Sequence, residues 1–190
     1  FDGYLYCGSW DGAVWRSDDG IAWQDVVTGG FGDPNNGIAR FAVYNNLLYA
    51  GTWNGTTGTQ IWRTNNGTFW TMFGDGLDPV NILDGAISTE IFGGYLYWGA
   101  GNWVTGAQLW RTDGITLTQI SDPGFASQAI SSLAAFDGFL YAGLWSDTST
   151  QVWRSANGTD WTQLVTFSDL GSGINDANGL EVYDGMLYLV

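Results

Sequence analysis

The chain of 190 residues contains no lysine and no histidine, so its positive charge comes from five arginines alone. Nineteen acidic residues give it a formal net charge of −14 at pH 7. Phosphate backbones and anionic membranes are bound by clusters of basic side chains, so we expect no nucleic-acid partner and no membrane insertion. Without histidine, the His-dependent nucleophilic triads and the Cys/His zinc clusters are also excluded.

Cysteine and proline are scarce too, with one and three residues, and no apolar run is long enough for a signal peptide or a membrane span. The lone Cys7 cannot form an internal disulfide. It aligns with Ala50 and Ala142 in later copies of a repeat, so we expect a small core residue. Abundant glycine and tryptophan, 29 and 12 residues, indicate short strands and tight turns.

An internal repeat of about 46 residues is the most informative feature. Each copy contains a phrase such as "FDGYLYCGSW", and its second tyrosine marks the copy: Tyr6, Tyr49, Tyr97, Tyr141 and Tyr188. A second phrase, such as "VWRS", places one arginine in each copy: Arg16, Arg63, Arg111 and Arg154. In the second copy four strands are expected at about 38–44, 47–52, 60–64 and 69–73, the first two joined by a two-residue turn.

Four short strands per repeat predict an all-β fold, a β-propeller of four-stranded antiparallel blades. We expect one propeller segment over residues 1–190, with blades at approximately 1–37 (partial), 38–85, 86–128, 129–177 and 178–190 (partial). The repeat pattern predicts one strand more than a closed ring of four blades contains. The chain is therefore interpreted as part of a ring of five to eight blades.

The turn between the third and fourth strands carries the most specific motif, "SDDGIAW" at Ser17–Trp23, "TNNGTFW" at Thr64–Trp70 and "SANGTDW" at Ser155–Trp161. It resembles the Asp-box, or bacterial neuraminidase repeat, of sialidase-like propellers. The resemblance implies a propeller fold, an extracellular or cell-surface location and a structural role for the box. In such a turn Asp or Asn binds the backbone, glycine permits positive φ and tryptophan packs beneath.

The catalytic set of sialidases, three convergent arginines with a Tyr–Glu pair and an acidic Asp, is not present. The four repeated arginines occupy one slot in successive blades, so they cannot meet at one carboxylate. We expect each to form an ion pair or to stack on tryptophan. No catalytic residue is assigned, and the chain is not expected to be an enzyme.

Three charged residues depart from the repeat, and all lie on predicted first strands of blades: Arg40, Glu90 and Glu181. Their offsets from the marker tyrosine place them on one strand face, near the propeller axis. An acid/base site at the channel mouth is one interpretation. An Arg40–Glu90 pair between adjacent blades, with Glu181 solvated, is the preferred one.

Repeated tryptophans give the strongest functional signal. They stand at or near the end of the second strand of each copy: Trp10, Trp53, Trp103 and Trp145. Three copies begin the third strand with glutamine: Gln60, Gln108 and Gln151. An indole face beside an amide suits a sugar, because the ring stacks on C–H groups and the amide binds hydroxyls. Packing of the tryptophans between blades, with each glutamine bound to a neighbouring loop, is the preferred interpretation.

These observations favour a non-catalytic extracellular propeller that binds carbohydrate or a cell-surface glycoconjugate. A structural module of an assembly, self-associating through sheet edges, and a fragment of a glycoside hydrolase are the alternatives. Three sequons predict N-glycosylation at Asn54, Asn66 and Asn157, with Asn54 preferred because the others belong to the box. No cofactor and no metal site is assigned, although loops such as "GFGDPNN" and "SDLGSGIND" contain oxygen ligands suited to Ca²⁺.

Overall fold

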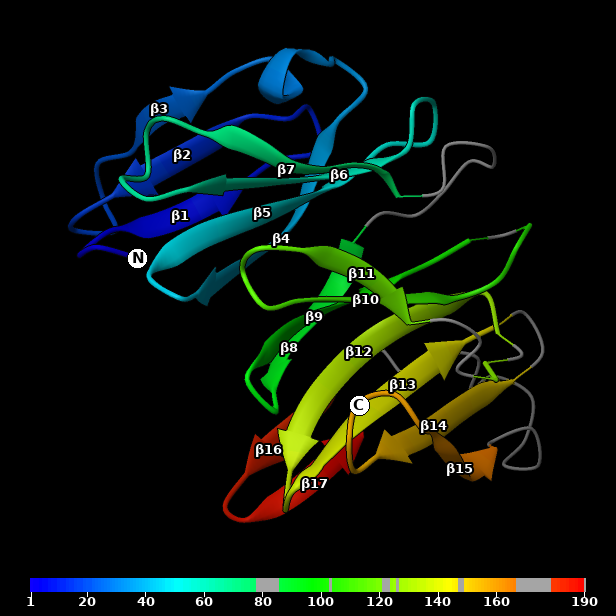
Figure 1. Cartoon of the computed structure of the whole chain (residues 1–190). Helices are drawn as coiled ribbons and strands as arrows, with labels where there is room; N and C mark the ends of the chain where they lie inside the picture. Colours follow the sequence, from blue (N-terminus) through cyan, green and yellow to red (C-terminus); the bar gives the residue numbers. More distant parts are fainter. Residues whose placement is uncertain are drawn as a thin grey trace. The chain divides into compact units, whose positions relative to one another are not determined.

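The computed structural model describes residues 1–77, 86–102, 104–120, 124–125, 127–146, 149–166 and 179–189. It divides into two compact units, Phe1–Ala86 and Ile87–Val190. In the described part, each unit consists of antiparallel sheets whose strands follow one another in chain order (Figure 1).

The first unit contains a three-stranded and a four-stranded sheet. The first sheet comprises β1 (Leu5–Gly8), β2 (Val14–Ser17) and β3 (Gln24–Val27), and the second β4 (Gly37–Tyr44), β5 (Leu47–Trp53), β6 (Thr59–Thr64) and β7 (Thr71–Leu77). A short 3₁₀ turn, η1 (Gly30–Gly32), precedes β4. The β4–β5 hairpin turns through Asn45 and Asn46 at φ of 48° and 61°, as a two-residue turn with positive φ at both positions requires.

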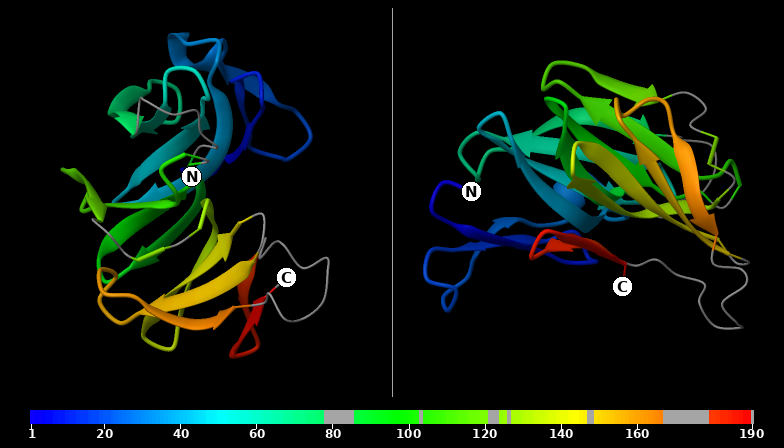
Figure 2. Two further views of the ribbon diagram at one scale, coloured as in Figure 1. Left: turned by 90° about the vertical axis from the view of Figure 1, so that its right-hand side faces the viewer. Right: turned by 90° about the horizontal axis from the view of Figure 1, so that it is seen from below.

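The described part of the second unit contains two four-stranded sheets and a hairpin. Its first strand, β8, begins at Ala86, the last residue assigned to the first unit. The first sheet comprises β8 (Ala86–Phe92), β9 (Tyr95–Ala100), β10 (Gln108–Thr112) and β11 (Leu117–Ile120), and the second β12 (Ala129–Phe136), β13 (Phe139–Trp145), β14 (Thr150–Ser155) and β15 (Thr162–Thr166). The hairpin comprises β16 (Leu180–Tyr183) and β17 (Met186–Leu189), drawn in red in Figure 2. β12 lies against β9, and β16 lies against β12 and β13.

One predicted strand begins later than expected. The sequence pattern placed the fourth strand of the second copy at 69–73, whereas β7 begins at Thr71. The Asn66 side chain explains the difference, because its Oδ1 accepts hydrogen bonds from the N–H groups of Thr68 and Phe69 at 3.0 and 2.9 Å. These residues are thereby held in the turn rather than in the strand.

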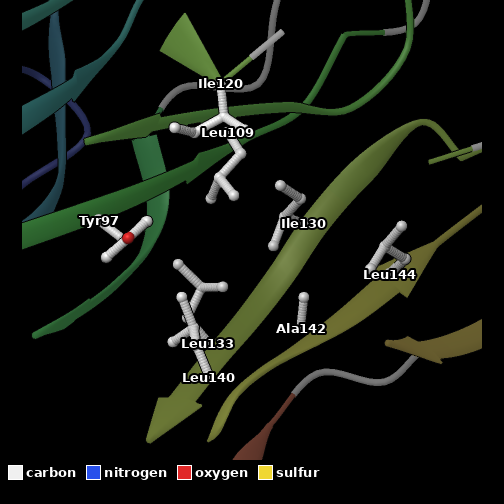
Figure 3. Packing of buried hydrophobic residues seen from close by; sticks show 8 residues of the cluster. All are labelled: Tyr97, Leu109, Ile120, Ile130, Leu133, Leu140, Ala142 and Leu144. Carbon is white, nitrogen blue, oxygen red and sulfur yellow. The ribbon is translucent and has the colours of Figure 1, made fainter. Parts of the chain in front are cut away.

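Apolar side chains fill the space between neighbouring sheets. In the second unit Tyr97, Leu109 and Ile120 come from the β8–β11 sheet. Figure 3 shows them facing side chains of β12 and β13, namely Ile130, Leu133, Leu140, Ala142 and Leu144. Burying an aliphatic side chain of this size contributes about 1.5–3 kcal/mol, so this layer is a major source of stability.

In two of these layers a phenylalanine from the loop before the first strand of a sheet, here called an aromatic wedge, packs on the tryptophans: Phe31 before β4 and Phe125 before β12. Phe31 of η1 stacks on Trp62 with 4.6 Å between ring centroids and 9° between planes. In the second unit Phe125 packs edge-on against Trp153 and Trp161 at 5.4 and 5.2 Å. The wedge fills the volume between the two tryptophans and the preceding sheet.

Cys7 is a correction to the sequence analysis. Its counterparts Ala50 and Ala142 are fully buried, but Cys7 is exposed. The alignment with alanine was right, yet it assumed that a neighbouring sheet covers the same face in every copy. Among the described residues of this unit no sheet lies on the Cys7 face of β1–β3.

Candidate functional site

Among the repeated tryptophans that the structure describes, the most exposed one, Trp10, forms an aromatic pair in the first unit. Trp10 is 76% exposed. Its ring packs edge-on against Trp53, with centroids 5.9 Å apart and an interplanar angle of 82°. An edge-to-face contact covers a face of one ring only, and with Trp10 largely exposed the pair presents open apolar ring surface for stacking.

The backbone around Trp10 is held against the start of β4. The carbonyl of Ser9 accepts hydrogen bonds from the N–H groups of Gly12 and Ile38 at 3.1 and 2.8 Å. Gly37 lies against Trp10, because a Cβ built there would come within 3.0 Å of the Trp10 carbonyl oxygen and 3.4 Å of Cε3 of its indole. Glycine at 37 therefore allows the tryptophan to sit on the strand, and the indole is attached to a fixed backbone.

A hydrogen-bonded polar network starts one residue after Trp53. The amide nitrogen of Asn54 donates to Asn36 Oδ1 at 2.7 Å and to Asp33 Oδ2 at 3.1 Å. Thr57 Oγ1 donates to the same Asp33 oxygen at 2.6 Å, and Asn36 donates to Gln60 Oε1 at 2.8 Å. The network connects the loop before β4 with the β5–β6 loop, so the rim of the aromatic pair is ordered.

Two carboxylates flank the aromatic pair. The hydroxyl of Thr57, with backbone and side-chain N–H groups of Asn35 and the Asn54 amide, lowers the pKa of Asp33 below its usual value. The hydroxyl of Ser9 lowers the pKa of Asp11, next to Trp10 in the chain. Both groups are therefore ionised at neutral pH, and the surface repels anions and suits neutral or cationic ligands.

The side chains of the repeated glutamines form hydrogen bonds within the protein. Each side-chain oxygen accepts a hydrogen bond from the indole N–H of the tryptophan two residues later, at 3.0, 3.1 and 2.8 Å for Gln60–Trp62, Gln108–Trp110 and Gln151–Trp153. Gln60 and Gln151 are buried as well. Their geometry favours the packing interpretation over sugar contact, and the polar partners beside Trp10 come from the Asp33–Asn54 network instead.

Two of the other repeated tryptophans are less accessible than Trp10. Trp53 and Trp145 are half-buried at the ends of β5 and β13. Trp103 lies outside the described residues. Among the three described members of the set, Trp10 is therefore strongly exposed while Trp53 and Trp145 are not, so they do not form equal platforms.

Two of the three charged residues on first strands lie in the second unit, and the third lies in the first unit. Glu90 on β8 is half-buried, and burial raises the pKa of its carboxyl, opposed by the N–H groups of Ile91 and Ala135. The charge of Glu181 on β16 adds to the rise in the Glu90 pKa, so the two carboxylates of the second unit interact. Arg40 is exposed on β4 of the first unit.

The three sequons differ in accessibility. Asn66 and Asn157 are exposed at the tips of their turns. Asn54 is fully buried, and its amide nitrogen already donates two hydrogen bonds. The preference for Asn54 is therefore reversed: an enzyme that attaches a glycan to the folded chain can reach Asn66 and Asn157 but not Asn54.

The repeated arginines stack on phenol and phenyl rings. Arg16, Arg111 and Arg154 lie over Tyr4, Tyr95 and Phe139 at 4.4, 4.4 and 4.6 Å from the ring centroids. In the second copy this ring position is Leu47, and Arg63 lies instead over Phe73 of β7 at 4.2 Å. The prediction of stacking was right in kind but wrong in naming tryptophan, because the indoles face the neighbouring sheets.

Sequence reasoning missed the aromatic wedges. A Gly-Phe pair precedes the first strand at residues 30–31 and again at 124–125, which is the signal that identifies them.

Within the described ranges no group of three or more Cys, Asp or Glu is placed to hold a metal ion. Asp33 of the "GFGDPNN" loop is hydrogen-bonded, and "SDLGSGIND" lies outside the described residues. The described part also contains no helix with the length and apolar character of a membrane span.

Comparison with known proteins supports the fold. No protein-family model matches the chain, and no curated protein matches it. Similar solved structures include a chain of the mitotic checkpoint complex, with a TM-score of 0.62, 14% identity and coverage of 94% of this chain and 52% of that one. A chain of the nidogen/laminin complex gives a TM-score of 0.59 at 15% identity, covering 93% of this chain and 65% of that one.

An α-L-arabinofuranosidase from Clostridium thermocellum is also similar, with a TM-score of 0.51, 13% identity and coverage of 91% of this chain and 68% of that one. The chain thus spans about half to two thirds of the length of these neighbours. Identities this low show the fold alone. With the sheet topology, they confirm an all-β propeller fold of four-stranded antiparallel blades.

Proposed function

We propose that this protein binds carbohydrate, without catalysis, through the surface formed by Trp10 and Trp53. The exposed Trp10 ring carries the proposal, because an indole that remains open on a fixed backbone is the stacking platform that sugar C–H faces require. The Asp33–Asn54 network supports it by placing ordered acceptors beside the ring. A glycoside hydrolase among the structural neighbours is in keeping with a glycan ligand.

Charge narrows the class of glycan. Asp11 and Asp33 are ionised beside the ring, and the whole chain carries a net charge of −14. Sialylated and sulfated sugars would be repelled, whereas neutral hexoses and amino sugars would not. The expected ligand is therefore a neutral or amino-sugar glycan at a cell surface or in an extracellular matrix.

The Asp-box resemblance is part of the same proposal. Asp19 Oδ1 accepts the N–H groups of Ile21 and Ala22 at 2.7 and 2.8 Å, and Asn66 and Asn157 make the equivalent contacts. This turn chemistry supports kinship with sialidase-like propellers and, through it, an extracellular location. The turn itself acts in folding rather than in ligand binding.

A glycan array followed by titration tests the function. The unmodified protein is expected to bind neutral glycans, and Trp10→Ala is expected to weaken binding at least about tenfold, or about 1.4 kcal/mol. Ile115→Ala is the matched control, since Ile115 is 83% exposed but lies on a turn of the second unit. An absence of glycan binding, or equal affinity of Trp10→Ala and the unmodified protein, would contradict the proposal.

A fragment of a glycoside hydrolase is the second candidate. One observation favours it: Glu90, with its raised pKa, interacts with the exposed Glu181, and such carboxylate pairs serve as acid and base in glycoside hydrolysis. Turnover of aryl glycosides that is lost in both Glu90→Gln and Glu181→Gln would support this candidate. Turnover that survives both substitutions, or is never observed, would exclude these carboxylates.

A further inference from the structure

The triplet Asn-Gly-Thr occurs three times in the chain, beginning at Asn54, Asn66 and Asn157. The side-chain amide of an asparagine can be attacked by the backbone nitrogen of the following residue, which forms a succinimide and releases ammonia. Glycine in that position favours the attack, because it has no Cβ to shield its nitrogen. Since the three triplets are identical, differences in their reactivity come from the fold.

A threonine hydroxyl connects the two reacting groups of the second box. Thr64 Oγ1 accepts the N–H of Gly67 at 2.9 Å and donates its own proton to Asn66 Oδ1 at 3.1 Å. The hydroxyl therefore contacts both the attacking nitrogen and the oxygen that gains negative charge during the attack. From this position it can relay the proton from the nitrogen to the oxygen, so that neither charge develops alone.

Backbone N–H groups polarise the same amide oxygen. Asn66 Oδ1 accepts the N–H groups of Thr68 and Phe69 at 3.0 and 2.9 Å. Fixed donors on an oxygen that gains negative charge stabilise a tetrahedral intermediate. The box turn thus surrounds the exposed Asn66 amide with a proton relay and with donors for the developing charge.

The fourth copy repeats this arrangement with serine. Ser155 Oγ accepts the N–H of Gly158 at 2.8 Å and donates to Asn157 Oδ1 at 3.1 Å. The Asn157 amide nitrogen donates to Asp160 Oδ2 at 2.7 Å, which is in keeping with an amide whose oxygen faces the turn. Two copies therefore present the same set of reacting groups.

Asn54 has a different environment and serves as the internal reference. It is fully buried, and its amide nitrogen donates to Asn36 Oδ1 and Asp33 Oδ2 at 2.7 and 3.1 Å. The hydroxyl two residues earlier, Thr52 Oγ1, accepts the N–H of Gln60 at 2.9 Å. It is therefore occupied elsewhere, and the Asn54 amide is held in the interior.

We propose that the box turns of the second and fourth copies convert their own asparagines to aspartate. The Gly67 nitrogen bonds to Asn66 Cγ, and its proton passes through Thr64 Oγ1 to Oδ1. The Cγ–Nδ2 bond then breaks, the proton of the Oδ1 hydroxyl moves to Nδ2, and ammonia leaves a succinimide. Water adds its hydroxyl to Cγ and its proton to the Gly67 nitrogen as the Cγ–N bond breaks. One water is consumed and one ammonia is released; Asn157 follows the same steps.

The first copy shows that the turn accommodates the product. Asp19 occupies the position of Asn66, where Ser17 Oγ donates to its Oδ1 at 3.0 Å and accepts the N–H of Gly20 at 2.8 Å. Ring opening at Cγ, the carbonyl that the turn polarises, restores the normal main chain and gives aspartate rather than isoaspartate. A chain synthesised with two Asn boxes thus acquires Asp boxes without an enzyme.

Peptide mapping by mass spectrometry measures the reaction in the full chain during storage at neutral pH. Deamidation at Asn66 and Asn157 should be at least roughly tenfold faster than at Asn54 in the folded protein. In the chain unfolded by urea, the three identical triplets should react at similar rates. Asn66 and Asn157 should each react faster in the folded chain than in the unfolded one, because the relay exists only in the turn.

Substitution of the relay separates this activity from mere protection by the turn. Thr64→Val keeps the shape of the side chain but removes the hydroxyl, and should slow Asn66 at least roughly tenfold while leaving Asn157 unchanged. Thr64→Ser should retain the reaction, and Ser155→Ala should slow Asn157 alone. Near-UV circular dichroism checks that each variant is folded.

The opposite results would overturn the proposal. If the turn only protected Asn66, Thr64→Val would loosen it and deamidation would become faster. Slower reaction of Asn66 and Asn157 in the folded chain than in urea would have the same meaning. Isoaspartate as the main product in the folded chain would contradict ring opening at Cγ.

Discussion

The phenol ring of Tyr6 lies directly against Gly67. A Cβ built on Gly67 would contact Tyr6 Oη and lie 2.9 Å from Tyr6 Cζ. Tyr97 and Gly158 repeat the relationship in the second unit, where the Cβ–Cζ distance would be 2.6 Å. In both cases the second strand of one copy contacts the box turn of the next, so the marker tyrosine and the box glycine are two halves of one contact.

Substituting these glycines should cost unequal amounts of stability. Gly20→Ala introduces only the left-handed strain of alanine, about 1–2 kcal/mol, because φ is +76° and no side chain is displaced. Gly67→Ala, at φ +75°, adds overpacking against Tyr6, about 1–3 kcal/mol more. Urea unfolding measures both.

Tyr6→Phe provides the second half of that test. The Tyr6 hydroxyl is buried without a hydrogen-bond partner, so its removal should be neutral or stabilising and should recover part of the Gly67→Ala loss. Equal losses for Gly20→Ala and Gly67→Ala, or no recovery with Tyr6→Phe, would show that the contact does not constrain the turn.

Asn66→Asp should raise the melting temperature at pH 7. A charged acceptor binds the N–H groups of Thr68 and Phe69 more strongly than an amide does. Asp19 shows the consequence: the N–H groups of Ala22 and Ile21 lower the pKa of its carboxyl below 3.8. Because the pKa of this carboxyl is lower in the folded state, its ionised form stabilises the fold at pH values above the unfolded-state pKa. This stabilisation disappears as the pH falls through the folded-state pKa.

Thermal unfolding between pH 7 and pH 2 checks this pH dependence. The increase in melting temperature of Asn66→Asp should decline below pH 4. Asp19→Asn should be less stable than the unmodified protein at pH 7, and this difference should disappear toward pH 2. A decrease in melting temperature for Asn66→Asp at pH 7 would contradict the proposed turn chemistry.

Gln151→Ala should destabilise the protein without affecting ligand binding. It leaves the Trp153 indole N–H without its acceptor at 2.8 Å, which costs about 1–3 kcal/mol. Gln163→Ala on β15 is the control, since Gln163 is exposed and a change there should stay within about 0.5 kcal/mol. Equal stability of the two variants in urea, or a loss of glycan affinity in Gln151→Ala, would contradict a structural role for Gln151 and indicate that it contacts the ligand.

Glu90→Gln should stabilise the protein at pH 7. Burial raises the pKa of Glu90 above 4.5, so its charged form is disfavoured in the folded state and the penalty is present above the folded pKa. Acidification through the interval between the raised value and the unfolded value of 4.5 removes this penalty. The stabilisation should therefore be present at pH 7 and absent at pH 3; the opposite trend would contradict the burial of this carboxylate.

Local chemistry explains which parts of the structure were predictable. The turns at Asn45-Asn46 and the box motifs depend on residues adjacent in sequence, so the repeat revealed the strands and their order. Asn54 became buried through Asp33, 21 residues away, and Cys7 became exposed because no sheet among the described residues of its unit covers it. These features depend on contacts between sheets, and a single repeat unit does not encode them.

The same reasoning applies to the candidate site. Trp10, two residues after β1 ends, is exposed, whereas Trp53 and Trp145 at the ends of β5 and β13 are half-buried, so a position at a strand end does not by itself predict an exposed indole. The role of Gln60 was not predictable, because alternation along β6 places its amide beside Trp62, and the orientation of that indole is set by the Phe31 ring. Side chains two residues apart on one strand face are therefore the first alternative to weigh against a ligand contact.

Indole N–H spectra of ¹⁵N-labelled protein, recorded during titration with the best neutral glycan from the array, test the central claim most directly. Among the signals of twelve tryptophans, that of Trp10, assigned by its loss in Trp10→Phe, should shift first, together with that of Trp53. The signals of the buried Trp70 and Trp98 should stay fixed. Shifts confined to Trp15 and Trp23, or none at any glycan concentration, would contradict carbohydrate binding at the Trp10–Trp53 surface.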